Sequence, residues 1–118
     1  MQVGGTMRMQ VFGPGVPCDA GNAAYTSVIG TSTGSWQYFA GTYEVGVGVK
    51  IYKNGILGDA DAYTGNIGNY TNELFFGGSI NASYAMNGRI AAAKAYSKSL
   101  TAAEVLQNYN ADKSRFGL

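Results

Sequence analysis

Histidine is absent from the sequence, and this absence excludes more chemistry than any residue that is present. Without histidine there is no Ser-His-Asp or Cys-His mechanism, no His general base and no His-ligated zinc. Cys18 is the only cysteine, so thiolate metal sites and an intramolecular disulfide are excluded as well. We expect Cys18 to be an inert, partly buried thiol, with a reactive thiol or an intermolecular bridge as the alternatives.

Charge is also scarce, because Asp, Glu, Lys and Arg make up only 13% of the chain. The eight Lys and Arg residues are scattered and the net charge is +1, so nucleic acid is not an expected partner. No apolar run approaches the length that crosses a bilayer, so no membrane partner is expected. The first residues, MQVGGTMRMQVFGPG, lack the apolar segment of a secretory signal. We therefore expect the protein to stay in the cell that makes it, or to leave by assembly into a particle.

Glycine and tyrosine are abundant, with 18 and 9 copies, and 46% of the chain is hydrophobic. Together with Ser, Thr and Asn, this composition is typical of short strands joined by tight turns. The length of 118 residues is close to the commonest domain size. We therefore predict a single domain that spans residues 1–118.

The strongest local pattern is the stretch VGVGVKIYKNGIL at Val45–Leu57. Its valines and Ile51 occupy every second position, which predicts a strand at 45–53 with one apolar face. Asn54-Gly55 then predicts a type I′ hairpin turn, because both central residues of that turn need positive φ. Some seven short strands separated by turns indicate an antiparallel sandwich. The other predicted strands are 7–12, 25–29, 36–43, 56–57, 74–76 and 88–96, with a long surface loop at 58–72.

A helix start is marked near the end of the chain. Thr101 and Glu104 form a capping box, in which each side chain satisfies a backbone N–H group of the first turn. We predict a helix from Ala102 to about Ala111, which is too short to be stable alone and must dock on the sheet. Its predicted apolar stripe consists of Val105, Leu106 and Tyr109.

From about Gly34 onward, three motifs resemble the concanavalin A-like (laminin G-like) jelly-roll family. WQYFAGTY at Trp36–Tyr43 is similar to the aromatic strand of that family, and KIYKNG at Lys50–Gly55 is similar to its hairpin. NGRI at Asn87–Ile90, followed by AYSKSLTAAEV at Ala95–Val105, resembles its closing element. The resemblance implies an all-β, antiparallel jelly-roll sandwich with one short C-terminal α-helix.

The resemblance also bears on partners. Asn108–Leu118 is similar to the version of this module found in phage and viral structural proteins. Only 35 residues precede Trp36, fewer than is usual in the family, so the sheet is either reduced or completed by another chain. An uncovered sheet edge invites pairing. We therefore expect an oligomer, or a protein bound to a larger scaffold, with residues 1–22 as the contact.

Two sets of residues are candidate binding sites. Asp59 and Asp61 could ligate Ca²⁺, which prefers clustered carboxylates, and the alternative is a solvated loop. No other cofactor is expected. Rings flanked by Asn suit the rim of a sugar site, and the alternative is that they fill the edges of a small sandwich. The tyrosines in such a context are Tyr63, Tyr70 and Tyr84.

The sequence therefore favours a non-enzymatic structural or adhesive module, most simply a decoration or appendage protein on the surface of a phage or virus particle. An extracellular location, or a cytoplasmic one before assembly, is the alternative. The second functional candidate is a lectin-like module that binds surface glycans. The third is a glycan hydrolase, which needs only two carboxylates. Hydrolases of the wider superfamily cluster their acids as E-x-D-x-x-E on one strand, and this chain has no similar motif.

Overall fold

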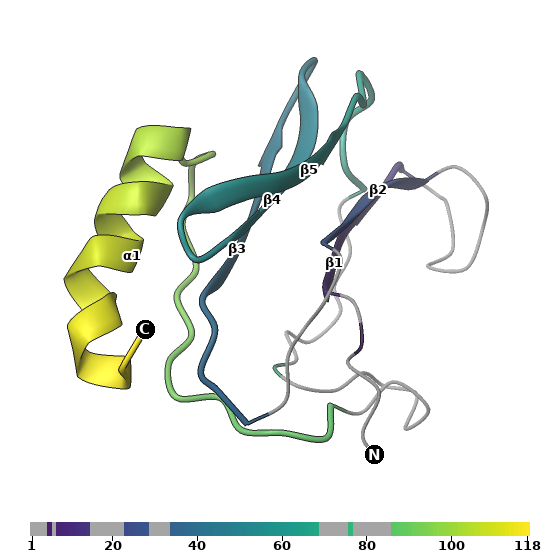
Figure 1. The fold of residues 1–118 in the computed structure, drawn as a ribbon. Helices are drawn as coiled ribbons and strands as arrows, with labels where there is room; N and C mark the ends of the chain where they lie inside the picture. The colour runs from purple at the N-terminus through teal and green to yellow at the C-terminus, as the bar shows by residue number, and fades with distance from the viewer. Residues whose placement is uncertain (1–4, 6, 15–22, 29–33, 69–75, 77–85) are drawn as a thin grey trace.

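The computed structural model describes residues 5, 7–14, 23–28, 34–68, 76 and 86–118. Their strands form two antiparallel sheets, β1 with β2, and a second sheet in the order β3-β4-β5. The predicted class, all-β and antiparallel with one C-terminal helix, is confirmed, although the described strands do not make up a full jelly roll. The elements are β1 Met7–Phe12, β2 Ala23–Val28, β3 Phe39–Glu44, β4 Gly48–Lys53, β5 Ile56–Asp61 and α1 Ala102–Phe116 (Figure 1).

The three-stranded sheet lies between two other layers (Figure 1). The β1–β2 pair packs on its inner face, where Val49 is fully buried against Val11 of β1. Met9, Tyr43 and Tyr63 close around this core. Helix α1 lies on the opposite, outer side of the sheet. Because other layers cover both faces of β4, this strand lies at the centre of the fold.

The prediction of a strand from Val45 was wrong at its start. Residues 45–47 form the turn between β3 and β4, closed by the Val47 N–H group, which donates to the Glu44 carbonyl at 3.1 Å. Val45 and Val47 are therefore exposed rather than part of a buried row. β4 begins at Gly48, whose φ is +133°. A glycine in an alternating pattern fits a turn as well as a strand, because it adopts positive φ at no steric cost.

The hairpin turn at Asn54-Gly55 is confirmed, with φ of 50° and 79° at its two residues. Both values are positive, as a type I′ turn requires. Asn54 has a second role that the sequence did not indicate. Its Oδ1 accepts from the Tyr38 N–H group at 2.9 Å, and its own N–H group donates to the Tyr38 carbonyl at 2.8 Å. The turn is thereby fastened to the segment that leads into β3.

β5 is longer than predicted and extends to Asp61 within the expected 58–72 loop. Its pairing with β4 shifts by one residue, since Tyr52 pairs with Leu57 whereas Ile51 pairs with Asp59. Gly58 is therefore the extra residue of a β-bulge. Backbone hydrogen bonds to β4 hold these residues in a strand. Their sequence is too polar for the strand to be recognised from its hydrophobic pattern.

α1 begins at the predicted residue but ends at Phe116, five residues later than expected. The aromatic side chains of the helix contact residues that are distant in the sequence. In the extension, the Phe116 ring packs on Trp36 at 6.3 Å between centroids. Within the predicted part of the helix, Tyr109 packs on Tyr38 at 5.9 Å. Gly117 closes the helix in the left-handed conformation with φ of 67°. Within the described residues, no helix has the length and apolar character needed to cross a bilayer.

The strand predicted at 88–96 is not formed, because these residues have no regular secondary structure. The segment is instead fastened to α1 by side chains. Lys94 forms an ion pair with Asp112 at 2.7 Å, and Asn108 donates to the Tyr96 hydroxyl at 3.1 Å. The Asp112 carboxylate raises the pKa of Lys94 by this hydrogen bond. Residues 74 and 75 of the strand predicted at 74–76 lie outside the described residues, as do Cys18 and, apart from residues 5 and 7–14, the contact predicted at 1–22.

Candidate functional site

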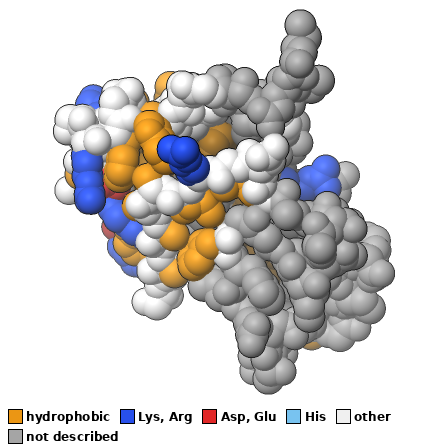
Figure 2. All heavy atoms as spheres, turned by 90° about the horizontal axis from the view of Figure 1, so that it is seen from below, with side chains coloured by type: hydrophobic (Ala, Val, Ile, Leu, Met, Phe, Trp, Pro, Cys, Tyr) orange, Lys and Arg blue, Asp and Glu red, His pale blue; other side chains and the backbone are white. Residues whose placement is uncertain are grey.

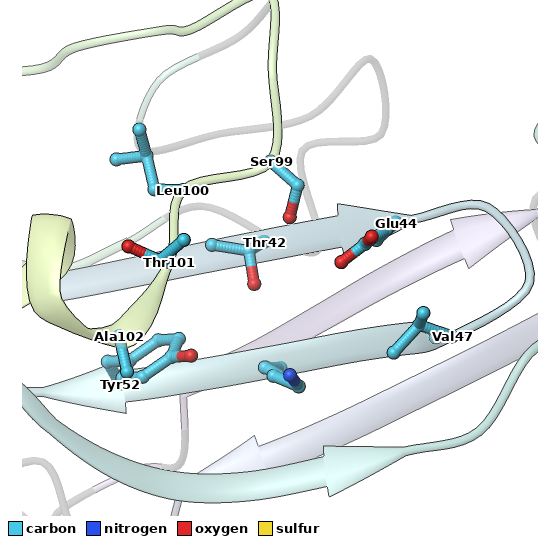
Figure 3. Close-up of a pocket in the computed structure, with 10 residues that line it drawn as sticks. Thr42, Glu44, Val47, Tyr52, Ser99, Leu100, Thr101 and Ala102 are labelled. Atoms are coloured by element: carbon cyan, nitrogen blue, oxygen red, sulfur yellow. The ribbon is translucent and has the colours of Figure 1, made fainter.

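A polar groove of about 200 Å³ lies where β3 and β4 pass beneath the segment that leads into α1 (Figure 3). We call it the outer groove. Figure 3 shows hydroxyl and carboxylate oxygens from both sides of the groove facing the same space. The side chains that give it chemistry are Thr42, Glu44, Lys50, Tyr52 and Ser99.

The two-residue period of the strands brings these side chains together. Thr42 and Glu44 are two residues apart on β3, and Lys50 and Tyr52 are two residues apart on β4, so each pair shares one face. Thr42 pairs directly with Lys50 across the ladder. The intervening residues Val49 and Ile51 point to the inner face and form the core. Because the apolar side chains of the strands fill the inner face of the sheet, the alternating polar side chains point to the outer face.

Two hydroxyl groups in the outer groove are buried. The exposed fraction of Tyr52 is 2% and that of Thr42 is 7%. Within the described part of the chain, neither hydroxyl has a hydrogen-bonding partner. A buried polar group without a partner costs about 1–3 kcal/mol. Such a group in a native protein calls for an explanation, which can be an ordered water, an ion or a ligand.

The charged groups of the outer groove are also unpaired among the residues described. Glu44 is exposed and Lys50 is half-buried, and neither forms an ion pair there. On its other side, Lys50 faces Ala60 of β5 rather than an acid. The groove therefore offers a carboxylate acceptor, an ammonium donor and hydroxyl groups that can do both.

The start of α1 forms the far wall of the groove. Thr101 is the N-cap, and its Oγ1 accepts from the Glu104 N–H group at 3.2 Å. Glu104 in turn accepts from the Thr101 N–H group at 2.8 Å, which completes the predicted capping box. The hydrogen bond from Lys98 and then that from the Thr101 backbone lower the pKa of Glu104. These contacts hold residues 99–102 in place over the sheet.

Of the three tyrosines predicted as a sugar-binding rim, Tyr63 alone lies among the described residues. The Tyr63 ring packs on Tyr43 at 6.3 Å between centroids and belongs to the inner core. The Tyr43 hydroxyl donates to the Gly65 carbonyl at 2.6 Å, which fastens the same loop. Tyr70 and Tyr84 lie outside the described residues.

The aspartates predicted as a Ca²⁺ site lie on β5 and not in a loop, which corrects that part of the prediction. Because Asp59 pairs with Ile51 and Asp61 pairs with Val49, both are on the inner-face side of the sheet. Asp59 Oδ1 accepts from the Ala60 N–H group at 2.9 Å. Among the described residues, no group of three or more His, Cys, Asp or Glu side chains could hold a metal ion. Glu44 lies on the opposite face and cannot join them.

The outer groove was missed by the sequence reasoning. Its residues look like the solvated side of half-buried strands, and polar residues at every second position are the rule there. The useful signal was Tyr52, a large side chain in the polar row of β4. A residue of that size on a supposedly solvated face indicates that something covers it.

One comparison with known proteins gave a match. The chain matches a family model described as the Concanavalin A-like lectin/glucanases superfamily over residues 4–106. The match begins before Gly34, where the predicted resemblance starts, and therefore includes β1 and β2. It ends within α1, so residues 107–118 lie beyond it. Neither a curated protein nor a solved structure gave a significant match.

Proposed function

Because the chain belongs to the concanavalin A-like lectin/glucanases superfamily, whose domains can bind carbohydrates or serve structural roles, we propose that it is a non-enzymatic structural or adhesive module. It works in contact with other protein subunits, as one member of an oligomer or as a copy attached to a larger scaffold. The observation that carries this proposal is the amount of apolar surface that the described residues leave open to solvent.

Exposed hydrophobic side chains outnumber buried ones in the described part of the chain. Five hydrophobic residues are buried there, whereas eleven large ones are exposed. Figure 2 shows hydrophobic side chains gathered on the described part of the face seen from below. Single exposed apolar residues are ordinary on a monomer, but contiguous patches mark sites of interaction.

Three of these exposed side chains lie around the β4–β5 turn. Ile56 is 72% exposed, Leu57 is 49% exposed and Leu106 of α1 is 44% exposed. The Leu106 side chain lies against Gly55, so the helix and the hairpin contribute to one surface. We call Ile56, Leu57 and Leu106 the hairpin patch. Its position on two elements makes it suitable for a second protein surface.

A virion surface is the setting that we propose for this assembly. Its support is the similarity of Asn108–Leu118 to modules of phage and viral structural proteins. Sparse charge favours the same setting, because a surface with few charges is easier to bury against neighbouring subunits. In this setting the domain acts by binding neighbouring protein subunits.

The proposal of a non-enzymatic role is supported by the residues that catalysis would need. The chain has no histidine. Glycoside hydrolysis needs two facing carboxylates, but Glu44 lies on the outer face of the sheet whereas Asp59 and Asp61 lie on the inner-face side. Glu104 is engaged in its capping box. Glycan binding is the second candidate function, and the outer groove is the observation that favours it.

The assembly proposal is tested by light scattering on the purified protein over a range of micromolar concentrations. We expect a mass above that of the monomer, and a shift toward the monomer in the double variant Ile56→Thr, Leu106→Gln. These changes keep the preference of each residue for strand or helix and remove apolar surface.

Val45→Thr is the matched control, because Val45 is also exposed but lies at the other end of β4. It should leave the measured mass unchanged. A monomer at every concentration that also fails to co-purify with any particle would contradict the proposal. Deletion of residues 1–22 is unsuitable as a test, because it removes β1 and with it the core residue Val11.

A further inference from the structure

We infer that the outer groove binds a small zwitterion, namely a free α-amino acid with a short polar side chain, such as serine. This role goes beyond the proposed assembly role and does not depend on it, since the groove and the hairpin patch share no residue. Such a ligand also differs from a glycan, because each charged group of the groove binds a charged group of the ligand. The groove offers opposite charges, a helix start and two buried hydroxyl groups.

Glu44 and Lys50 give the groove one carboxylate and one ammonium group. Because Thr42 pairs with Lys50, and Glu44 lies two residues further along β3, the two charged residues are diagonal neighbours on one face of the sheet. Long side chains at such positions reach the same small ligand. Among the residues described, neither forms an ion pair. A simple anion would be repelled by Glu44 and a simple cation by Lys50, whereas an α-amino acid has an ammonium group for the first and a carboxylate for the second.

The start of α1 sets the direction in which the ligand lies. Ala102 is the first residue of the helix and lines the groove. The first N–H groups of a helix have no partner within it, and the Ala102 N–H group has none elsewhere in the described part of the chain. Figure 3 shows Ala102 at one end of the groove and Glu44 at the other. Since a helix N-terminus attracts negative charge, the ligand carboxylate lies on the side of α1 and Lys50, and its ammonium group lies toward Glu44.

The buried hydroxyl groups indicate a polar side chain on the ligand. Figure 3 shows the oxygens of Thr42 and Tyr52 on the groove side of the sheet, and both side chains are more than nine-tenths buried. Within the described residues, no protein group satisfies either hydroxyl. The hydroxyl group of serine donates to one of them and accepts from the other, which removes the cost of leaving them unpaired. Serine should therefore bind more tightly than alanine.

The size of the groove limits the ligand to a small amino acid. Its volume of about 200 Å³ equals that of roughly six or seven water molecules, at about 30 Å³ each. It is below the 300–1,000 Å³ or so of pockets that enclose drug-sized ligands. Serine, which has about as many non-hydrogen atoms as the groove has room for waters, fits this space. A dipeptide does not.

The test is a titration of the full chain, followed by NMR, with serine, alanine, N-acetylserine, serinamide, methyl glucoside and inorganic phosphate. We expect serine to bind at millimolar concentration and to perturb the signals of residues 42–52 and 99–102. N-acetylserine lacks the ammonium group and serinamide lacks the carboxylate, so each should bind about tenfold or more weakly, the value of a hydrogen bond to a charged group. Alanine should bind about threefold to tenfold more weakly, because it lacks one neutral hydrogen-bonding group.

Two variants assign the charges of the ligand to residues of the groove. Glu44→Gln should weaken the binding of serine by about tenfold but leave that of N-acetylserine unchanged. Lys50→Gln should weaken serine to a similar degree and leave serinamide unchanged. Asp59→Asn and Lys113→Gln are the matched controls, because they change the net charge equally and lie outside the groove. Both should leave the affinity for serine unchanged.

Four results would overturn the inference. They are that serine does not bind, that N-acetylserine or serinamide binds as tightly as serine, that serine binds equally well to Glu44→Gln and Lys50→Gln, and that only phosphate or methyl glucoside binds. The last of these, with methyl glucoside as the ligand, would instead favour glycan binding in the same groove. Light scattering of Glu44→Gln and Lys50→Gln should match that of the parent protein, which keeps this test apart from that of assembly.

Discussion

At the scale of single residues, Gly48 is the position with the least freedom to change. A Cβ atom placed there would lie 2.1 Å from the Asp61 carbonyl oxygen and 2.9 Å from two further backbone atoms. Its φ of +133° is in a region that L-amino acids rarely adopt. Backbone atoms cannot move aside as a flexible side chain can. The close approach of β4 to the end of β5 therefore depends on the absence of a side chain.

We predict that Gly48→Ala lowers the free energy of unfolding by more than about 2 kcal/mol, through strain and overpacking together. Gly46→Ala is the matched control, because Gly46 also has positive φ but nothing lies within 4 Å of the Cβ position. It should cost only the backbone strain, and therefore less. Urea unfolding of both variants measures the difference. Equal losses would show that the contact with Asp61 is unimportant.

Residue-level prediction from the sequence succeeded where the cause was local. Asn54-Gly55 forms a turn because the two residues themselves favour positive φ. The stretch from Val45 to Gly48 was misjudged because its alternation fits two structures, and the contact with Asp61 that decides between them is distant in the sequence. Thr42 and Tyr52 were missed for the same reason. Nothing local indicates that residues 99–102 cover them.

At the scale of elements, α1 shows the same division between local and distant causes. Its start was predicted correctly, because the capping box lies within four consecutive residues. Its end was placed five residues too early, because Phe116 and Asp112 are held by Trp36 and Lys94. The segment 88–96 was predicted as a strand from its own composition, yet its position is set by contacts with the helix.

We predict that the helix start loses stability in acid. Hydrogen bonds from Lys98 and from the Thr101 backbone lower the pKa of Glu104 below its usual value of 4.5. A carboxyl group whose pKa is lower in the folded state stabilises that state above its unfolded pKa. This contribution is lost as the pH falls through the folded pKa. The melting temperature should therefore fall between neutral pH and acid partly through Glu104.

Two variants assign this effect. Glu104→Gln should flatten the pH dependence of the melting temperature, and Lys98→Met should reduce it while leaving the capping box in place. Thermal unfolding followed by circular dichroism at several pH values provides the measurement. Identical pH profiles for the parent protein and Glu104→Gln would show that the helix start is insensitive to this charge.

At the scale of the whole molecule, stability depends on β4 because layers lie on both of its faces. Ile51 is 2% exposed on the inner side, and Tyr52 is 2% exposed on the outer side. The sequence predicted a strand with one buried face, so it placed Ile51 correctly and left Tyr52 in solvent. Short sequence motifs were enough to predict the family and the fold class. They did not predict that the β1–β2 pair and helix α1 cover opposite faces of the three-stranded sheet.

We predict that Ile51→Ala costs about 2–5 kcal/mol, as expected for deleting most of a buried aliphatic side chain. Typical domains have only about 5–15 kcal/mol of stability, so this loss should be visible throughout the molecule. Ile56→Ala, on the same hairpin but 72% exposed, should change stability by no more than about 0.5 kcal/mol. Chemical denaturation followed by tyrosine fluorescence and by circular dichroism compares them. A loss below 1 kcal/mol or so for Ile51→Ala would contradict a two-layered core around β4.

The extra residue Gly58 has a consequence for how this protein could change. If Gly58 instead took a regular place opposite Ile51, Asp59 and Asp61 would move to the other side of the sheet, because successive residues of a strand alternate between faces. Asp59 would then pair with Lys50, in place of Ala60. Two more carboxylates would stand on the face that carries Glu44. A one-residue shift in pairing that removed the bulge, without any substitution, would thus turn a mixed-charge surface into an acidic one, with carboxylates gathered as a hydrolase requires. The bulge therefore keeps the two aspartates and the mixed-charge surface with Glu44 on opposite sides of one sheet.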